Sequence, residues 1–293
     1  MRALNLIPAI LLAATITAGC ADLAPPTETG RTRDQVPVLS NGADKVTLCH
    51  KVRNTIAVGA PAVAAHLAHG DVEGPCDPAC VKNKPSGVIS WWRADGDVTD
   101  AVDANSGALV GGAGFGAGKC GLAFHFDAIG DRVEVPHHVS LNIEILPSAT
   151  VEGWFKSFGG LENVPGQVLI VGKHTCGVAT GWFFTTGSGA FIGNHLVGGF
   201  GLGALNLHDG LFHHFAVVKD GTSYFEYVDG VLLSSDAGPP AGTPAPGDPP
   251  MQIGAFSTGT CAPVMHQLNG LVDEVAIYNR ALSAAEIAAM NQP

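Results

Sequence analysis

Apolar and polar positions alternate in short runs along the second half of the chain, and turn signals separate these runs. In FHHFAVVKDGTSYFEYVDGVLLSS, residues 212–235, three apolar-rich runs are divided by Asp220-Gly221 and Asp229-Gly230. An Asp-Gly pair between apolar runs is a strong hairpin signal, because glycine readily adopts the positive φ of a tight turn. The pattern predicts a three-stranded antiparallel meander.

The stretch LVDEVAIYNRALSAAEIAAM, residues 271–290, predicts a further strand and then a closing helix. Strict alternation along the strand would place Asp273 and Val275 on one face and their even-numbered neighbours on the other. Ser283 and Glu286 have the spacing of a capping box, in which each side chain accepts a hydrogen bond from the other residue's backbone amide. A short helix is therefore expected to start at Ser283.

Residues 86–290 as a whole show this pattern of short strands. Residues 236–250, DAGPPAGTPAPGDPP, interrupt it and predict a loop, since proline has no amide to donate to a sheet. The chain holds 39 glycines and 19 prolines, and only 14% of its residues are charged. Such a balance is typical of many short strands joined by tight turns, so an all-β fold is expected for this part.

The residues before this region, 44–80, predict a small separate module. KVTLCHK and NTIAVGA are β-branched runs that suit two strands of a hairpin. Pro61 then stands where a helix could start, and the helix would end near Gly70-Asp71. The expected order is strand, strand and short helix, with Cys76 returning to the first strand.

The N-terminus predicts export. Arg2 precedes an apolar run that ends in TAGC, and this arrangement is typical of a secretory signal over residues 1–19. The ending resembles the lipobox of bacterial lipoproteins, which implies lipidation of Cys20; the alternative is an ordinary cleaved signal with an incidental cysteine. Residues 20–43 are polar and contain prolines, so we expect a flexible tether. The predicted location is the bacterial cell envelope, membrane-anchored by lipid only, or the secreted fraction.

Export directs the interpretation of the cysteines. Removing Cys20 from the seven cysteines leaves an even number, which favours disulfides in an oxidising compartment. A disulfide between Cys49 and Cys76 would close a loop of about 28 residues and would stabilise the fold by roughly 3 to 4 kcal/mol. The predicted pairs, two of them guesses among many, are Cys49–Cys76, Cys80–Cys120 and Cys176–Cys261.

Six sequence blocks within residues 86–290 resemble successive strands of the laminin-G-like jelly rolls of bacterial secreted proteins. They are GVISWWRADGDVTDAVDANSGALVGGAGFGAGKCGLAFHFDAIGDRVEVP, TVEGWFK, FHHFAVVKDG, YVDGVLL, MQIGAF and LNGLVDEVAIYNRALSAAEI. The resemblance implies a concanavalin A-like sandwich of two antiparallel sheets. Cys120, the loops of Cys176 and Cys261, and the proline-rich segment depart from the family's pattern.

The family implies sugar binding, adhesion, protein–protein contact or an accessory role beside an enzyme. We predict non-catalytic binding or adhesion, with a glycan or an extracellular or envelope protein as partner. Nucleic acid is not expected, because the formal net charge is −11. Calcium-binding members of the family use acidic residues after the first strand and in the last one, and the matching positions here are Asp100, Asp103 and Asp273. Calcium takes six to eight oxygen ligands, which suits a carboxylate-rich glycine loop. Alternatively, these side chains only hold turns and strand ends.

A carbohydrate-active enzyme is the rival hypothesis, and a purely structural envelope protein is a third. Retaining glycoside hydrolysis needs two carboxyl groups about 5 Å apart. The glucanase pattern Glu-x-Asp-x-x-Glu does not occur, since no Glu-x-Asp is present in the chain. Glu226 and Asp229 should point to different faces. Glu152 lies in a block where the family also has Glu, and we expect it to have a structural role. We therefore expect no catalytic residues.

Aromatic and histidine residues add weaker signals. Of the four tryptophans, Trp92 is expected to be the most accessible for stacking on a sugar, and the others are expected in the core: Trp91, Trp154 and Trp182. Adjacent residues on a strand point to opposite sides, so neither His137-His138 nor His213-His214 is expected to chelate a metal.

The module of residues 44–80 leaves two hypotheses open. A tetrahedral zinc site could be assembled there, because His66 and His69 would share one face of a helix. Oxidation of the thiols in an exported protein favours a disulfide clip instead. The residues in question are Cys49, His50, His66, His69, Cys76 and Cys80.

Overall fold

The computed structural model describes residues 45–50, 54–68, 71–74, 84–161, 168–178, 180–187, 189–192, 195–197, 205–239, 242–258 and 264–291. Several predictions lie outside these residues: the signal peptide, Cys20, the tether, His69, Cys76, Cys80 and Cys261. No helix within the described ranges is long and apolar enough to cross a membrane.

The N-terminal module is a small antiparallel sheet with one helix. Strands β1 (Lys45–His50) and β2 (Asn54–Gly59) pair along their full length, and β3 (Val72–Glu73) pairs with the other edge of β1. Helix α1 (Ala60–Ala68) connects β2 to β3 and has Pro61 in its first turn. The predicted order of strand, strand and helix is confirmed, and the short third strand is an addition to it.

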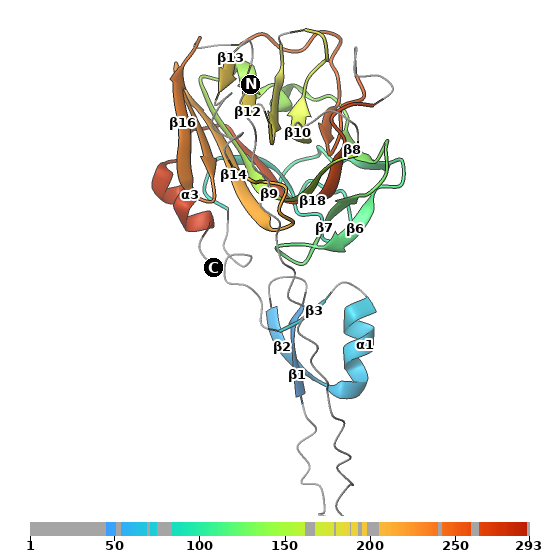
Figure 1. Cartoon of the computed structure of the whole chain (residues 1–293). Coiled ribbons are helices and arrows are strands. Elements are labelled where there is room, and N and C mark those ends of the chain that lie inside the picture. Colours follow the sequence, from blue (N-terminus) through green and yellow to red (C-terminus); the bar gives the residue numbers. More distant parts are fainter. Residues whose placement is uncertain are drawn as a thin grey trace, which may run out of the picture. The chain divides into compact units, whose positions relative to one another are not determined.

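The rest of the described chain forms two antiparallel sheets that face each other (Figure 1). The seven-stranded sheet has the order β13-β12-β11-β10-β17-β8-β5, and its strands are β5 (Ala108–Val110), β8 (Arg132–Val135), β10 (Leu169–Lys173), β11 (Trp182–Thr185), β12 (Gly189–Ile192), β13 (His195–Val197) and β17 (Met251–Ile253).

The eight-stranded sheet has the order β16-β15-β14-β9-β18-β7-β6, with β4 also paired to β18. Its strands are β4 (Val88–Trp92), β6 (Gly114–Ala117), β7 (Leu122–Phe126), β9 (Ser148–Gly160), β14 (Phe212–Asp220), β15 (Ser223–Val228), β16 (Val231–Ala237) and β18 (Leu268–Tyr278). The short 3-10 turns η1 (Val139–Leu141) and η2 (Ile143–Ile145) lead from β8 to β9.

The main core lies between the two sheets. Strands of both sheets contribute alternate apolar side chains to it, such as Val133 and Val135 from β8 and Phe215 and Val217 from β14. Burial of these side chains removes apolar surface from water, which is the main force that holds two sheets together. The all-β sandwich expected from the sequence is confirmed.

The predicted meander and its turns are confirmed. Strands β14, β15 and β16 pair in sequence. Asp229 and Gly230 have φ of 50° and 75°, as a tight hairpin turn with two positive φ values requires. After Ala237 the described residues up to Pro250 belong to no strand, in agreement with the loop expected there.

Helix α3 (Ala284–Met290) closes the described chain and confirms the capping box. The Ser283 hydroxyl accepts from the Glu286 amide, and the Glu286 carboxylate accepts from the Ser283 amide. Ile287 of this helix is buried in a second apolar cluster on the outer face of the eight-stranded sheet, together with Ala216 and Tyr278.

Strict alternation along β18 is wrong, because the strand contains a bulge. Its register against β9 shifts between Asp273 and Ala276, and Glu274 has a φ of 56°. As a result, Val272 and Val275 both lie in the core. The extra residue shifts the alternation of side chains between the two faces of the strand by one position, so Asp273 and Val275 do not share a face.

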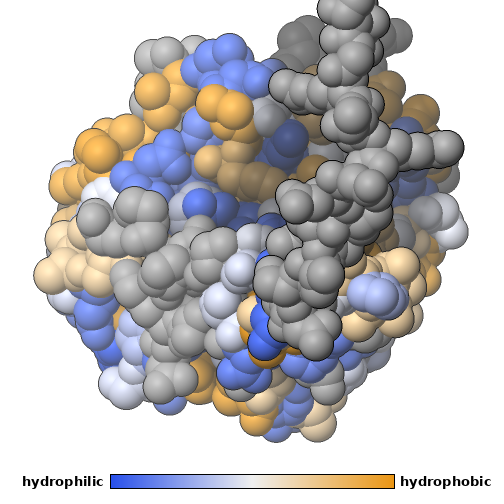
Figure 2. All heavy atoms as spheres, turned by 90° about the horizontal axis from the view of Figure 1, so that it is seen from below, coloured by the Kyte–Doolittle hydropathy of each residue, from blue (hydrophilic) through white to orange (hydrophobic). Residues whose placement is uncertain are grey.

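Surface hydrophobic residues are scattered. On the face shown in Figure 2, apolar and hydrophilic residues are interspersed in small patches. Among the described residues, the most exposed large apolar side chains come from separate parts of the sequence: Ile129, Val139, Leu211 and Val231.

Candidate functional site

A charged cluster lies on the outer face of the eight-stranded sheet, around the bulge of β18. We define the buried charged cluster as Lys84, Glu152, Asp273 and Glu274 with their hydrogen-bonding partners Trp91, His214 and Tyr278. The members come from the segment before β4 and from strands β4, β9, β14 and β18. These strands are adjacent in the sheet, which is why residues so distant in sequence meet.

Glu152 is the centre of the cluster and is fully buried. It accepts hydrogen bonds from Lys84 Nζ at 2.8 Å and from the Tyr278 hydroxyl at 3.1 Å, and it lies 3.2 Å from His214 Nε2. Burial alone would raise its pKa, but Lys84 and His214 outweigh this effect and hold the pKa below its ordinary value. Glu152 is therefore ionised at neutral pH.

Lys84 links two carboxylates. Its Nζ is 2.8 Å from Glu152 and 3.6 Å from Glu274, and it also donates to the Glu274 carbonyl at 3.3 Å. Burial opposes the charge of Lys84, yet the attraction of Glu152 and Glu274 raises its pKa above the ordinary value. The lysine thus keeps its positive charge beneath the surface.

Asp273 and Glu274 are neighbours in the bulge, and both have raised pKa values. Burial is the main cause for each, and the proximity of Asp95 adds repulsion. The carboxylate of Asp273 accepts from the Cys120 amide at 2.8 Å, and that of Glu274 accepts from Trp91 Nε1 at 2.7 Å. Asp273 and Glu274, which resist ionisation, therefore lie close to the ionised Glu152.

The backbone around the cluster is unusually constrained. Ala94 and Glu274 are two of the non-glycine residues with positive φ, at 58° and 56°. Gly118, in the turn between β6 and β7, has no room for a side chain, since a Cβ there would lie 2.7 Å from the Asp273 carboxylate. Left-handed backbone of this kind costs energy and persists only where the surroundings enforce it.

The chemistry open to this cluster is limited by access. The side chains of Glu152 and Glu274 are 0% and 6% exposed, and Lys84 lies between their carboxylates. A hydrolytic pair would need a substrate between the two carboxyl groups. The arrangement instead satisfies buried charges within the sheet, which agrees with the structural role expected for Glu152.

The acidic residues proposed for calcium are placed separately. Asp100 is buried and accepts from the amides of Trp91 and Val102, whereas Asp103 is exposed and accepts from the next amide along the chain. The ligand atoms of Asp100, Asp103 and Asp273 do not all lie within 4.8 Å of one another. Among the described residues, the ligand atoms of His50, His66 and Asp71 do. Among the described residues, Asp100 Oδ2 and Asp273 Oδ1 are each buried without a hydrogen-bond partner. Calcium at either one stays a prediction.

The interpretation of the tryptophans was partly wrong. Trp92 is fully buried in the core and donates from Nε1 to the Asn105 carbonyl. Trp91, on the other face of β4, is only half-buried and lies under Lys84 and Arg93, 5.4 and 5.1 Å from its ring centroid. Trp154 and Trp182 are buried as expected. The pairing of β4 with β18 decides which tryptophan faces inward.

The outer face of the seven-stranded sheet carries a different set of polar groups, which we call the polar row: Arg132, Glu134, Gln252 and Ser257. Arg132 forms an ion pair with Glu134 at 2.6 Å, and Gln252 on the adjacent strand β17 lies opposite Glu134. The Gln252 amide also bonds Ser257 and reaches Glu134 at 3.4 Å. The side chains of Arg132 and Glu134 are 15% and 32% exposed, so part of the row faces solvent.

The remaining predicted residues take structural places. Glu226 is buried in the core and Asp229 lies in the turn, where it accepts from His213 and from the His214 amide. His214 joins the buried charged cluster, so the two adjacent histidines point apart as expected.

His137 lies 3.6 Å from Asp248, and His138 caps η1. Cys49, Cys120 and Cys176 are the described cysteines, and none of them is free. Their pairing stays a prediction.

A family comparison assigns the sandwich. The family described as the concanavalin A-like lectin/glucanases superfamily matches residues 127–288, more than half of the chain. The chain belongs to this superfamily. The match covers strands β8 to β18 and most of α3, including Glu152, Asp273 and Gln252, whereas the N-terminal module lies outside it.

Solved structures show the superfamily fold in other proteins. Domain 4 of AbnA, an extracellular arabinanase from Geobacillus stearothermophilus solved with arabinotriose, is 17% identical with a TM-score of 0.52, over 70% of this chain and 98% of that one. The binding domain of botulinum neurotoxin serotype D/C is 11% identical with a TM-score of 0.50, over 70% of this chain and 51% of the neurotoxin domain. Both likenesses concern the fold. A comparison with curated proteins finds no match.

Sequence reasoning missed three features of this superfamily member. Lys84 lies before the first strand, 68 residues from Glu152, so no local pattern connects them. The role of Glu274 depends on the bulge. The polar row could have been suspected from RVEV in β8, whose alternating polar positions stand out from the apolar ones.

Proposed function

We propose that the protein is a non-catalytic glycan-binding protein of the bacterial cell envelope, and that the polar row on the outer face of the seven-stranded sheet contacts the sugar. The observation that carries the proposal is the hydrogen-bonded and partly exposed series of Arg132, Glu134 and Gln252 on adjacent strands. Sugar hydroxyls both donate and accept hydrogen bonds. A guanidinium, a carboxylate and an amide held in fixed positions offer both kinds of partner.

Aromatic residues next to the row support this assignment. Phe183 and Phe256 are packed at 5.6 Å with His174 against both, on the same side of the seven-stranded sheet. Phe183 is half-buried, so part of its surface is accessible beside the polar groups. An aromatic surface next to polar side chains is suited to a sugar ring, which has an apolar face and a polar rim.

The comparison with domain 4 of AbnA gives further support, because that domain was solved with arabinotriose and shares the fold. The absence of catalysis is part of the proposal. The carboxyl groups of Glu152 and Glu274, which are joined by Lys84, are too deeply buried to contact a substrate. Export, the lipid on Cys20 and the disulfides are also proposed, on the N-terminal sequence and the even number of remaining cysteines.

A glycan array with the full chain tests the proposal, followed by affinity measurements on the best ligand. Arg132→Gln should weaken binding by about tenfold or more, since a charged hydrogen bond contributes roughly 1.5 to 3 kcal/mol. Lys156→Gln is the matched control, because it removes one positive charge from the eight-stranded sheet instead.

Two results would contradict the proposal. One is binding that is equally sensitive to both substitutions, or to neither of them. The other is release of soluble sugars from any bound polysaccharide, which would support the enzyme hypothesis.

A further inference from the structure

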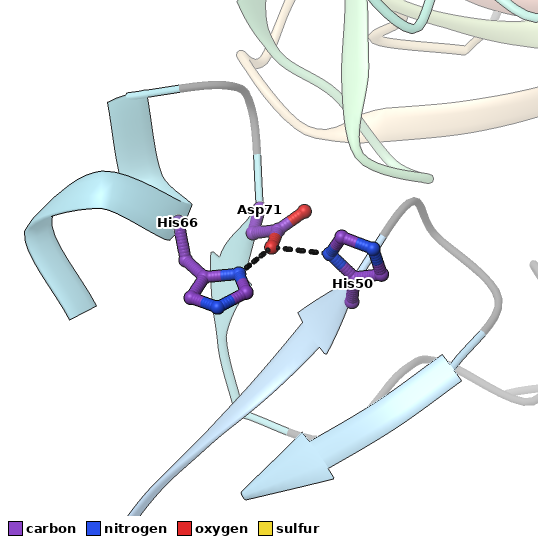
Figure 3. Close-up of side chains that lie close together, drawn as sticks. All are labelled: His50, His66 and Asp71. Atoms are coloured by element: carbon purple, nitrogen blue, oxygen red, sulfur yellow. Dashed lines mark hydrogen bonds and ion pairs between the residues drawn. The ribbon is translucent and has the colours of Figure 1, made fainter. Parts of the chain in front are cut away.

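The strongest unassigned group of side chains lies in the N-terminal module. Figure 3 shows His50 from the end of β1, His66 from α1 and Asp71 from the segment before β3 turned toward one another. His50 Nδ1 and His66 Nδ1 lie 2.7 and 2.6 Å from the same oxygen, Asp71 Oδ2. The two imidazole rings are 5.5 Å apart and nearly perpendicular.

Burial of this group is uneven in a way that suits a ligand site. The Asp71 side chain is 1% exposed, whereas His50 and His66 are 28% and 23% exposed. A buried carboxylate needs strong positive or hydrogen-bonding partners to offset the loss of hydration. The two half-exposed imidazoles provide these partners and leave a route from solvent to the group.

Within the described residues, the helix that carries His66 is held by few buried side chains. No residue of α1 is buried, and only Val63 and His66 are half-buried. Leu48 and Cys49 of β1 are the buried apolar residues within the described part of the module. Small modules without a sufficient apolar core are usually stabilised by disulfides or by a metal ion. His66 is thus a main contact between α1 and the sheet.

We propose that His50, His66 and Asp71 form a binding site for one divalent transition-metal ion of the zinc class, with His50 Nδ1, His66 Nδ1 and Asp71 Oδ2 as ligands. Two imidazoles and a carboxylate form a donor set that suits zinc, copper or nickel rather than calcium, which prefers oxygen ligands. The site differs from the thiolate site considered from the sequence, because it needs no cysteine.

The geometry requires only a small adjustment. Metal–ligand bonds of about 2.0 to 2.2 Å separate tetrahedral ligand atoms by about 3.3 Å. The observed nitrogen–oxygen distances of 2.6 and 2.7 Å must therefore lengthen by roughly 0.6 Å. An ionised Asp71 carboxylate would only accept hydrogen bonds, so each Nδ1 would be the donor at these distances. When the ion takes the place of these protons, each neutral imidazole carries its proton on Nε2.

Equilibrium binding of Zn²⁺ to the full chain, freed of metal by a chelator, tests the site. Wild-type protein should bind one ion, and binding should persist after alkylation of any free thiol. His66→Ala and Asp71→Asn should each weaken it by more than about 100-fold, beyond the loss typical of a residue that only supports a ligand. His137→Ala is the matched control, since His137 also lies beside an aspartate but belongs to no group of three possible ligands among the described residues.

A second measurement uses unaltered protein, in case a variant does not fold. Hydrogen exchange across residues 54–68 should slow on addition of Zn²⁺ and stay unchanged with Ca²⁺, because the ion would connect α1 to β1. Failure of wild-type protein to bind Zn²⁺ would overturn the proposal, and so would equal binding by His66→Ala, Asp71→Asn and the control. The glycan-binding proposal would be unaffected by either result.

Discussion

The outer faces of the two sheets use similar side chains in opposite ways. On the eight-stranded sheet, Lys84 and Glu152 are covered, and their charges are compensated by each other. On the seven-stranded sheet, the Arg132–Glu134 pair is partly open to solvent. An ion pair of a cation and a carboxylate therefore stabilises the fold where it is buried, and it is accessible to a ligand where it is partly exposed. The predictions below test this distinction, from the largest expected effect to the smallest.

Removing the buried cation should have the largest effect. Lys84→Met leaves Glu152 and Glu274 without their shared positive partner, and breaking a buried ion pair from one side typically costs about 3 to 5 kcal/mol. Urea unfolding measures the loss. The double variant with Glu152→Gln should recover part of it, because no uncompensated charge then remains at the centre. A loss below about 1 kcal/mol would mean that the cluster is hydrated.

A buried acid without a partner should respond to pH. Glu226 is 0% exposed, neither of its carboxyl oxygens has a hydrogen-bond partner among the described residues, and burial raises its pKa from 4.5 to about 7. The folded state therefore keeps a proton that the unfolded state has lost. Its contribution to stability is full below the unfolded pKa and disappears as the pH rises through about 7.

Glu226→Gln should remove this part of the pH dependence. At 1.36 kcal/mol per pKa unit, the difference corresponds to roughly 3 kcal/mol between pH 4 and pH 8. Unfolding free energies of both proteins across this range provide the measurement. Parallel curves for wild type and variant would show that Glu226 reaches water in the folded state.

The exposed pair should affect binding rather than stability. Arg132→Gln is expected to change the unfolding free energy by less than about 1 kcal/mol, since partly exposed ion pairs contribute little. Its glycan affinity should fall by about tenfold or more. If the same substitution destabilises the fold as strongly as Lys84→Met, the contrast between the two faces is wrong.

The cap of helix α3 should give the smallest effect. Ser283→Ala removes the acceptor for the Glu286 amide and should cost about 1 kcal/mol. Ser283→Thr keeps an acceptor and serves as control. Because Ile287 packs against the outer face of the eight-stranded sheet, thermal unfolding should report the loss. Equal melting temperatures for both variants would show that the cap contributes nothing to that packing.

Local signals in the sequence predicted local structure well. The Asp-Gly turns, the capping box and Pro61 each depend on residues within a few positions of one another, and all three are confirmed. The sandwich followed from the alternation of apolar residues and from the family resemblance, both of which extend over most of the chain.

The sites could not be predicted in the same way, because they depend on distant pairings. Lys84 and Glu274 are 190 residues apart, and they meet only because β4 pairs with β18. The bulge in β18 placed Asp273 and Val275 on different faces, although we expected them on one. The pairing of β4 with β18 buried Trp92, whose ring we expected to be accessible. His50 and His66 were found as candidates from their type, but Asp71, which brings them together, carried no signal beyond its turn-like position.

The position of Lys84 also has a mechanical consequence. A pull on the chain from its N-terminal side would enter the sandwich at the ion pair of Lys84 with Glu152, followed by the bond from Arg280 to the Ser86 carbonyl and the pairing of β4 with β18. These bonds lie in series along one short segment: Glu152 belongs to the interior strand β9, Arg280 follows β18, and β4 pairs with the interior strand β18. The load would pass from β4, whose described strand partner is β18 alone, into β9 and β18, two interior strands that each have neighbours on both sides.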